Sequence, residues 1–102
     1  MPPYPKLDPI FHQPVRTRIA ISLVMEPRSF KQLKALLNIT DGNLDAHLKK
    51  LSNEGYLHSQ MITDDGRPYT LYQLSDSGRR AFNDYEKALR LWLSHLQETD
   101  NS

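Results

Sequence analysis

The sequence contains no cysteine, and this absence excludes several kinds of site. Disulfides, thiolate metal sites and a cysteine nucleophile all require that residue. No run of about 18 apolar residues occurs, so we expect no membrane-spanning helix and no membrane partner. The first residues also lack an apolar signal segment. We therefore expect a cytoplasmic protein.

The chain has almost no net charge, with 13 Lys and Arg against 12 Asp and Glu in 102 residues. This balance gives no overall basic bias of the kind that many nucleic-acid binders show. The charge is unevenly distributed, however: residues 12–80 carry ten basic and seven acidic side chains, whereas residues 81–102 carry two basic and four acidic ones. Any contact with nucleic acid must therefore depend on a modest local surplus of positive charge.

Apolar spacing, helix caps and chain breakers predict one mainly α domain with a small β-hairpin. Four prolines among residues 1–9 exclude regular structure there, so residues 1–13 are predicted to be an N-terminal arm. Ser29, Thr40 and Ser75 are the expected N-caps. The predicted elements are helices at about 14–25, 30–37, 41–54 and 75–96, strands at about 56–63 and 69–74, and a turn at 64–68.

This order of elements is typical of a winged helix-turn-helix, in which a hairpin follows the second helix of the pair. Three blocks of sequence carry a more specific resemblance. They are HQPVRTRIAISL, SFKQLKALLNITDGNLDAHLKKLSNEGYL and DDGRPYTLYQLSDSGRRAF. Over residues 12–82 the chain resembles small single-domain winged-helix transcriptional regulators of the MarR and ArsR type. The resemblance implies homodimers that bind duplex DNA through a recognition helix and the wing.

The resemblance places the recognition helix on the third predicted helix. The first role expected of Asp41 there is to stabilise the helix, and contact with bases is its second. It also makes Arg67 the wing-tip residue that enters the minor groove, although Tyr69 stands where the family usually has a second basic residue. Lys49 and Lys50 are either phosphate contacts or solvated charges. The expected DNA-binding residues are Thr40, Gly42, Asn43, Asp45, Ala46, His47, Lys49, Lys50 and Arg67.

The last predicted helix carries apolar residues at alternating intervals of three and four, which is typical of a helix-packing seam. We divide the chain into the arm, a winged helix-turn-helix domain at 14–80, and a dimerisation helix with its tail at 81–102. The alternative is that this helix folds back over the first helix of the same protomer. The expected dimer-interface residues are Tyr85, Leu89, Trp92, Leu93 and Leu96.

No catalytic constellation is present in the sequence, and the four histidines have no metal-ligand spacing. We therefore predict a non-enzyme without metal or cofactor; a small-molecule effector is possible in principle, but no residue pattern supports one. The rival function is a winged-helix adaptor that binds protein only. The distribution of charge over the surface distinguishes the two hypotheses. DNA binding is favoured if Lys31, Lys34, Lys49, Lys50 and Arg67 lie on one face that no acidic residue interrupts.

Overall fold

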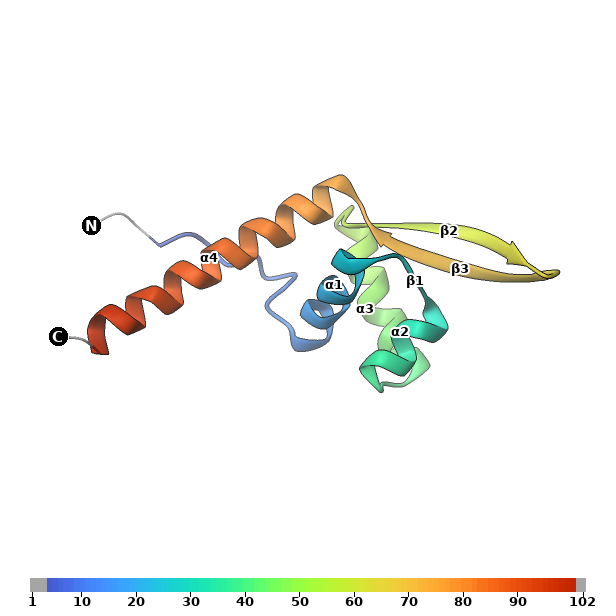
Figure 1. Ribbon diagram of the computed structural model, residues 1–102, viewed down its shortest axis with the longest axis horizontal. Coiled ribbons are helices and arrows are strands. Elements are labelled where there is room, and N and C mark those ends of the chain that lie inside the picture. The colour runs from blue at the N-terminus through green and yellow to red at the C-terminus, as the bar shows by residue number, and fades with distance from the viewer. Residues whose placement is uncertain (1–3, 101–102) are drawn as a thin grey trace.

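The elements occur in the predicted order, with one additional short strand (Figure 1). The computed structural model describes residues 4–100, with side chains as far as Leu96. The strands form one antiparallel sheet in the order β1-β3-β2. The elements are α1 (Pro14–Met25), β1 (Arg28–Ser29), α2 (Phe30–Leu37), α3 (Asp41–Asn53), β2 (Leu57–Asp64), β3 (Arg67–Leu74) and α4 (Asp76–Asp100).

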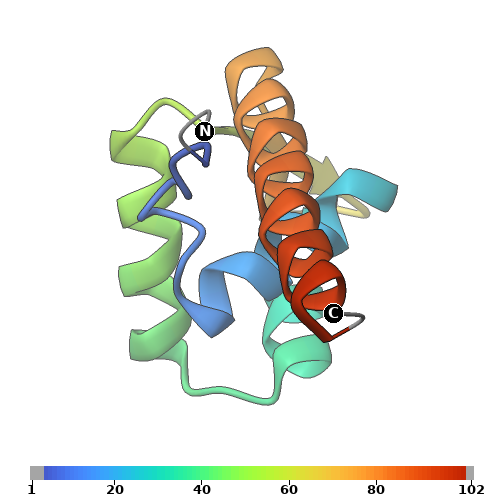
Figure 2. The ribbon, with the colours of Figure 1, turned by 90° about the vertical axis from the view of Figure 1, so that its left-hand side faces the viewer.

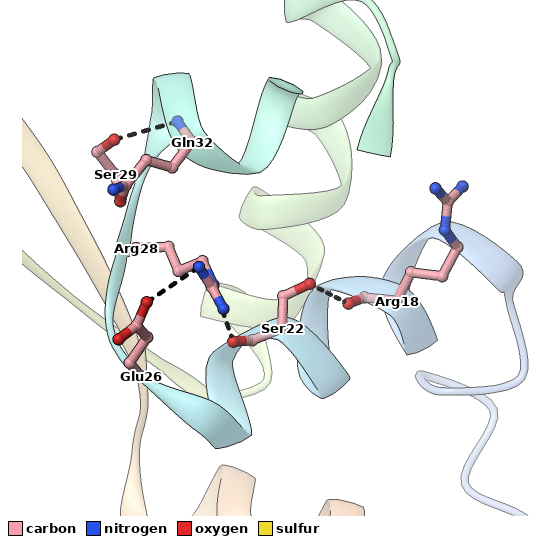
Figure 3. Close-up of polar contacts among 6 residues, drawn as sticks. All are labelled: Arg18, Ser22, Glu26, Arg28, Ser29 and Gln32. Atoms are coloured by element: carbon pink, nitrogen blue, oxygen red, sulfur yellow. Dashed lines mark hydrogen bonds and ion pairs between the residues drawn. The ribbon is translucent and has the colours of Figure 1, made fainter. Parts of the chain in front are cut away.

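The helices begin at the predicted caps. The Ser29 hydroxyl accepts from the Gln32 amide at 3.1 Å, and the Gln32 side chain accepts from the Ser29 amide at 2.9 Å, which is a capping box (Figure 3). The Thr40 hydroxyl caps α3 by accepting a hydrogen bond from the Asn43 amide at 3.2 Å. Ser75 caps α4, because its hydroxyl accepts from the Gly78 amide at 3.0 Å. Local chemistry therefore sets where each of these helices starts.

Strand β1 was not predicted, because two residues are too few to show an alternating pattern. Arg28 and Ser29 pair with Tyr72 and Leu71 of β3. The Arg28 guanidinium also donates to the Ser22 carbonyl at 3.1 Å and pairs with Glu26 at 3.1 Å (Figure 3). These contacts join the end of α1 to the base of the wing.

The hairpin turn is tighter than predicted. Strands β2 and β3 pair as far as Asp64 and Arg67, so the turn consists of two residues and not of 64–68. Asp65 and Gly66 both have positive φ, at 53° and 76°, which is the type I′ geometry that Asp-Gly favours. Pro68 is tolerated within β3 because β1 reaches only Leu71 and Tyr72, which leaves the proline at an edge.

The N-terminal arm contributes to the hydrophobic core, which the proline-rich sequence did not indicate. Ile10 and Phe11 are buried together with the apolar faces of α1, α2 and α3. The Phe11 ring lies 5.3 Å from Tyr56, 5.1 Å from Phe82 and 5.7 Å from Tyr85. Figure 2 shows the blue arm running between α3 and α4. Residues 10 and 11 therefore belong to the body of the domain.

The wing and α4 project from the helical body in opposite directions (Figure 1). The radius of gyration is 16.3 Å, compared with about 13 Å for a compact domain of this length. Helix α4 starts at Asp76, so the predicted domain boundary at 80/81 falls inside a continuous helix. None of the described helices has the length and apolar character needed to cross a membrane.

Candidate nucleic-acid interface

Helix α3 separates a buried apolar face from an exposed polar one. Leu44, Leu48 and Leu51 are buried in the core, as their spacing predicted. The predicted DNA-contact residues that lie on the exposed side are Gly42, Asn43, Asp45, Ala46, Lys49 and Lys50. The helix thus presents a short row of polar and small side chains that no other element covers.

The start of α3 is open to solvent. Thr40, the N-cap, is exposed, and a Cβ added at Gly42 would meet no atom within 4 Å. Packing within the protein therefore does not require a glycine here. The open amide end of a helix favours an anion, because its free N–H groups and its dipole point outward.

The acidic residues near this face are paired with lysines. Lys34 of α2 lies 2.7 Å from Asp41, and Lys49 lies 3.0 Å from Asp45 one turn away. Lys31, Lys50 and Arg67 form no ion pair among residues 4–96 and are exposed. Asp41 and Asp45 therefore interrupt the basic face, but a lysine neutralises each of them. The three cations named above remain without an ion pair within residues 4–96.

His47 is the one predicted contact residue on α3 that is half-buried. Its Nδ1 lies 3.1 Å from a guanidinium nitrogen of Arg16, whose Nε donates to the Ile10 carbonyl at 2.6 Å. Burial and, second, the positive charge of Arg16 lower the pKa of His47 below its ordinary value of 6.5. The neutral imidazole therefore accepts a hydrogen bond that ties α3 to α1 and the arm.

We expect Arg16→Gln to raise the pKa of His47, because the substitution removes an adjacent positive charge. In the native protein, the folded state binds fewer protons than the unfolded state just below pH 6.5, so the free energy of unfolding falls as the pH drops there. An NMR titration of the His47 ring measures the shift. Arg18→Gln is the control, since it removes the same charge from α1 without touching His47; an equal shift in both variants would contradict the assignment.

A concave surface lies between α2 and the wing, and we call it the α2–wing concavity. Its volume is about 860 Å³, and it contains Lys31 from α2 and Arg67 from the wing. Its other polar lining includes Ser29, Gln32, Asp64, Tyr69, Thr70 and Tyr72. Burial and, second, the negative charge of Asp45 raise the pKa of the Tyr72 hydroxyl. Sequence reasoning did not place Tyr72 beside Ser29 and Gln32, because it is the pairing of β1 with β3 that brings Tyr72 to them.

The residues expected at the dimer interface do not share one environment. Tyr85 is buried in its own protomer, where its ring meets Phe11 and Phe82, so it belongs to the core and not to an outer face. The Trp92 ring stacks on Tyr4 at 4.4 Å, and its Nε1 donates to the Pro5 carbonyl at 3.0 Å. Of the expected interface residues, Leu89, Leu93 and Leu96 are exposed on α4.

Residues 15–93 match the protein family described as Winged helix DNA-binding domain. The chain belongs to this family. An uncharacterized protein of Methanocaldococcus jannaschii is 40% identical over 77 residues, which are 74% of this chain and 84% of the relative. The description of this family names DNA binding and no catalytic activity. No group of three His, Asp or Glu side chains within the described part of this winged-helix protein is placed to hold a metal ion.

Solved structures share the fold. A transcriptional regulator homologue from Pyrococcus horikoshii OT3 superposes with a TM-score of 0.81 at 29% identity, covering 87% of this chain and 89% of that one. A proposed MarR-family regulator from Enterococcus faecalis V583 gives 0.77 at 16% identity, with 92% and 86% covered. PadR of Bacillus subtilis, solved with operator DNA, gives 0.64 at 18%, with 72% and 46% covered. The resemblance to small winged-helix regulators and the predicted fold class are thus confirmed.

Proposed function

We propose that this winged-helix protein is a homodimeric transcriptional regulator that binds specific sequences of double-stranded DNA in the cytoplasm. The observation that carries the proposal is the exposed polar face of α3 beside the α2–wing concavity, with Lys31, Lys50 and Arg67 free of ion pairs within residues 4–96. A helix of this kind fits the major groove, and a hairpin beside it reaches the flanking minor groove.

On α3, the side chains divide into base-reading and phosphate-contacting groups. Asn43 is exposed one turn from the helix start, where its amide can form two hydrogen bonds with adenine. Lys50 lies two turns further on, where it can meet a phosphate. The Lys34 and Lys49 ion pairs are on the surface and contribute little stability, about 0–1 kcal/mol each, so both lysines can turn to phosphates at small cost. Gly42 allows a phosphate to approach the helix start closely.

The wing supplies Arg67 at its tip. The two-residue turn holds this arginine at the first position of β3, exposed and next to Pro68. A narrow minor groove concentrates negative potential and attracts an arginine side chain. Asp64 lies opposite Arg67 in the strand register, so its carboxylate weakens the nonspecific attraction of the wing to phosphates.

Two DNA-binding domains are needed for useful affinity. A surplus of three positive charges on residues 12–80 is small, so one domain alone binds phosphates weakly. In a two-fold dimer, the second domain binds at a high effective concentration once the first is on the DNA. The two half-sites would then be about 34 Å apart, one turn of the duplex.

The adaptor hypothesis is less well supported. On α3 the exposed acids Asp41 and Asp45 are both paired with lysines, whereas Asp64 and Asp65 on the wing form no ion pair within residues 4–96. Membership of a DNA-binding domain family also supports a nucleic-acid partner.

The test is selection of bound sequences from a random duplex library at low salt, with the full chain as bait. We expect enrichment of a palindrome whose flanks are rich in A·T pairs, because the proposed contact of Arg67 is with a narrow minor groove. In Arg67→Ala, the flanking preference should disappear while the central motif persists. Arg80→Ala, which removes an exposed charge on α4, is the control and should leave both unchanged. Failure to enrich any sequence would contradict the proposed function.

A further inference from the structure

The chain contains two Asp-Gly pairs, and the fold gives them different surroundings. Asp41 and Gly42 begin α3, whereas Asp65 and Gly66 form the turn at the end of the wing. A glycine has no side chain to hinder its own amide nitrogen, so in an Asp-Gly pair this nitrogen can reach the aspartate side chain. Such a pair rearranges without an enzyme wherever its backbone is free to rotate.

The rearrangement has two balanced steps. In the first, the glycine nitrogen attacks the carboxyl carbon of the aspartate side chain. A C–N bond forms, and the carboxyl hydroxyl leaves with the amide proton as water, which gives a succinimide ring. In the second, water adds to the main-chain carbonyl of the ring and breaks its bond to nitrogen. The chain then runs through the aspartate side chain as isoaspartate, with one carboxylate as before, so the net charge does not change.

The wing turn is free to rotate into the reacting geometry. Asp65 and Gly66 are both exposed, and a Cβ added at Gly66 would meet no atom within 4 Å. The Asp65 carboxylate has no hydrogen bond or ion pair within residues 4–96. The turn lies at the far end of the wing from the helical body (Figure 1). Strand pairing ends at Asp64 and Arg67, so rotation about the Cα–C bond of Asp65 opposes no pairing beyond the turn itself.

The backbone of Asp65 also has little to lose by this rotation. Its φ of 53° lies in the left-handed region, which is costly for a residue with a Cβ. The attack by the Gly66 nitrogen requires Asp65 to leave its present backbone conformation. Part of the cost of the rotation is therefore offset by the release of an unfavourable conformation.

Asp41 also precedes a glycine, but the fold restrains it. Its carboxylate lies 2.7 Å from the Lys34 ammonium. Asp41 is the first residue of α3, where the Thr40 carbonyl accepts from the Leu44 amide at 3.0 Å and the helical hydrogen bonds continue. A Cβ at Gly42 would also meet nothing within 4 Å, so free space does not distinguish the two sites. Rotation at Asp41 would unwind the start of a cooperative helix.

We propose that Asp65 is a site of spontaneous isoaspartate formation in the folded protein, and that the fold directs this modification to the wing turn and away from Asp41. The product adds one methylene to the main chain of a turn whose type I′ geometry requires two residues. The pairing of Asp64 with Arg67 is then lost, and Arg67 has no fixed position at the start of β3. The effect on Arg67 as a DNA contact rests on the proposed function, whereas the modification itself does not.

Peptide mapping of aged protein tests the site. The full chain is stored at neutral pH and physiological temperature and digested with trypsin, and each peptide is assayed with protein isoaspartate methyltransferase. The two Asp-Gly pairs fall in separate peptides, residues 35–49 and 51–79, because trypsin does not cleave before Pro68. We expect methylation of 51–79 and almost none of 35–49, whereas a chain aged in urea should be methylated in both. Equal methylation of both peptides from the folded chain, or none in 51–79, would overturn the proposal.

Two variants at Asp65 keep the turn and change only its chemistry. Gly-Gly and Asn-Gly both suit a type I′ turn, so Asp65→Gly and Asp65→Asn should fold like the native chain, which circular dichroism checks. Asp65→Gly has no carboxyl group and should leave 51–79 unmethylated after ageing. Asp65→Asn forms the same ring with loss of ammonia, and does so faster, because a neutral amide is a better electrophile than an ionised carboxylate. Methylation of 51–79 from aged Asp65→Gly would assign the reaction to another residue and overturn the proposal.

Selection of bound duplexes by fresh and aged protein measures the consequence for the wing. The aged native chain should lose its A·T-rich flanking preference and keep the central motif, whereas aged Asp65→Gly should keep both. Because the modification leaves the net charge unchanged, such a loss reports the position of Arg67 and not the charge of the wing. An equal loss in aged Asp65→Gly would overturn this effect. A fresh chain that selects no sequence would contradict the proposed function, while the peptide map would still decide the modification.

Discussion

Gly78→Ala is expected to destabilise the fold by about 3 kcal/mol or more, as an overpacked side chain against rigid backbone does. A Cβ at this position would lie 2.2 Å from the carbonyl oxygen of Tyr56 and 2.9 Å from its carbonyl carbon. The same carbonyl accepts a hydrogen bond from the Ser75 amide at 2.9 Å, so it cannot move away without breaking the junction between α4 and the chain that follows α3. Urea unfolding of the full chain measures the loss.

Gly42→Ala is the matched control for this experiment. Gly42 also lies within a helix, but its added Cβ would meet nothing within 4 Å. Because alanine has the higher helix propensity, this variant should be stabilised, by up to about 1 kcal/mol. Equal destabilisation of the two variants would show that helix chemistry, and not the close approach of α4 to Tyr56, decides the outcome.

The features that sequence reasoning predicted well depend on neighbouring residues. The caps at Ser29, Thr40 and Ser75 each involve a hydrogen bond between residues three apart. The buried leucines of α3 follow from helical spacing alone. The order of these local signals was enough to predict the winged helix-turn-helix fold.

The features that sequence reasoning missed depend on contacts between distant residues. Phe11 enters the core only because Tyr56, Phe82 and Tyr85 surround it, and the prolines before it gave no sign of this. Tyr85 has the spacing of a seam residue, yet Phe11 occupies the space beside it. A seam pattern shows that a helix face is apolar, but it does not show whether the arm, the body or a second copy covers it.

The candidate nucleic-acid interface also has features that the sequence predicts and features that depend on distant contacts. The exposed residues of α3 could be named from the order of elements, since the polar face of an amphipathic helix follows from its apolar one. The partners of those residues could not, because Lys34 reaches Asp41 from α2 and Arg16 reaches His47 from α1. These contacts determine which of the charged side chains already have a partner within the protein.

The largest effect on DNA binding is expected when three cations of the proposed interface, none of which forms an ion pair within residues 4–96, are removed together. Lys31→Ala, Lys50→Ala and Arg67→Ala in one chain should weaken binding on the order of 100-fold at moderate salt, and should lower the slope of log affinity against log salt by about three. Fluorescence anisotropy over a salt series gives both values. The folded state should persist, because all three side chains are exposed.

The control for this variant removes the same charge from elsewhere on the molecule. Lys6, Arg80 and Lys87 are exposed on the arm and α4, so replacing all three with alanine changes the net charge equally without touching α2, α3 or the wing. If DNA is attracted only by the net charge, the two triple variants lose the same amount of affinity for DNA. If the α2–wing concavity and α3 form the interface, only the first variant loses its salt dependence, because counterions are released only where phosphates are contacted.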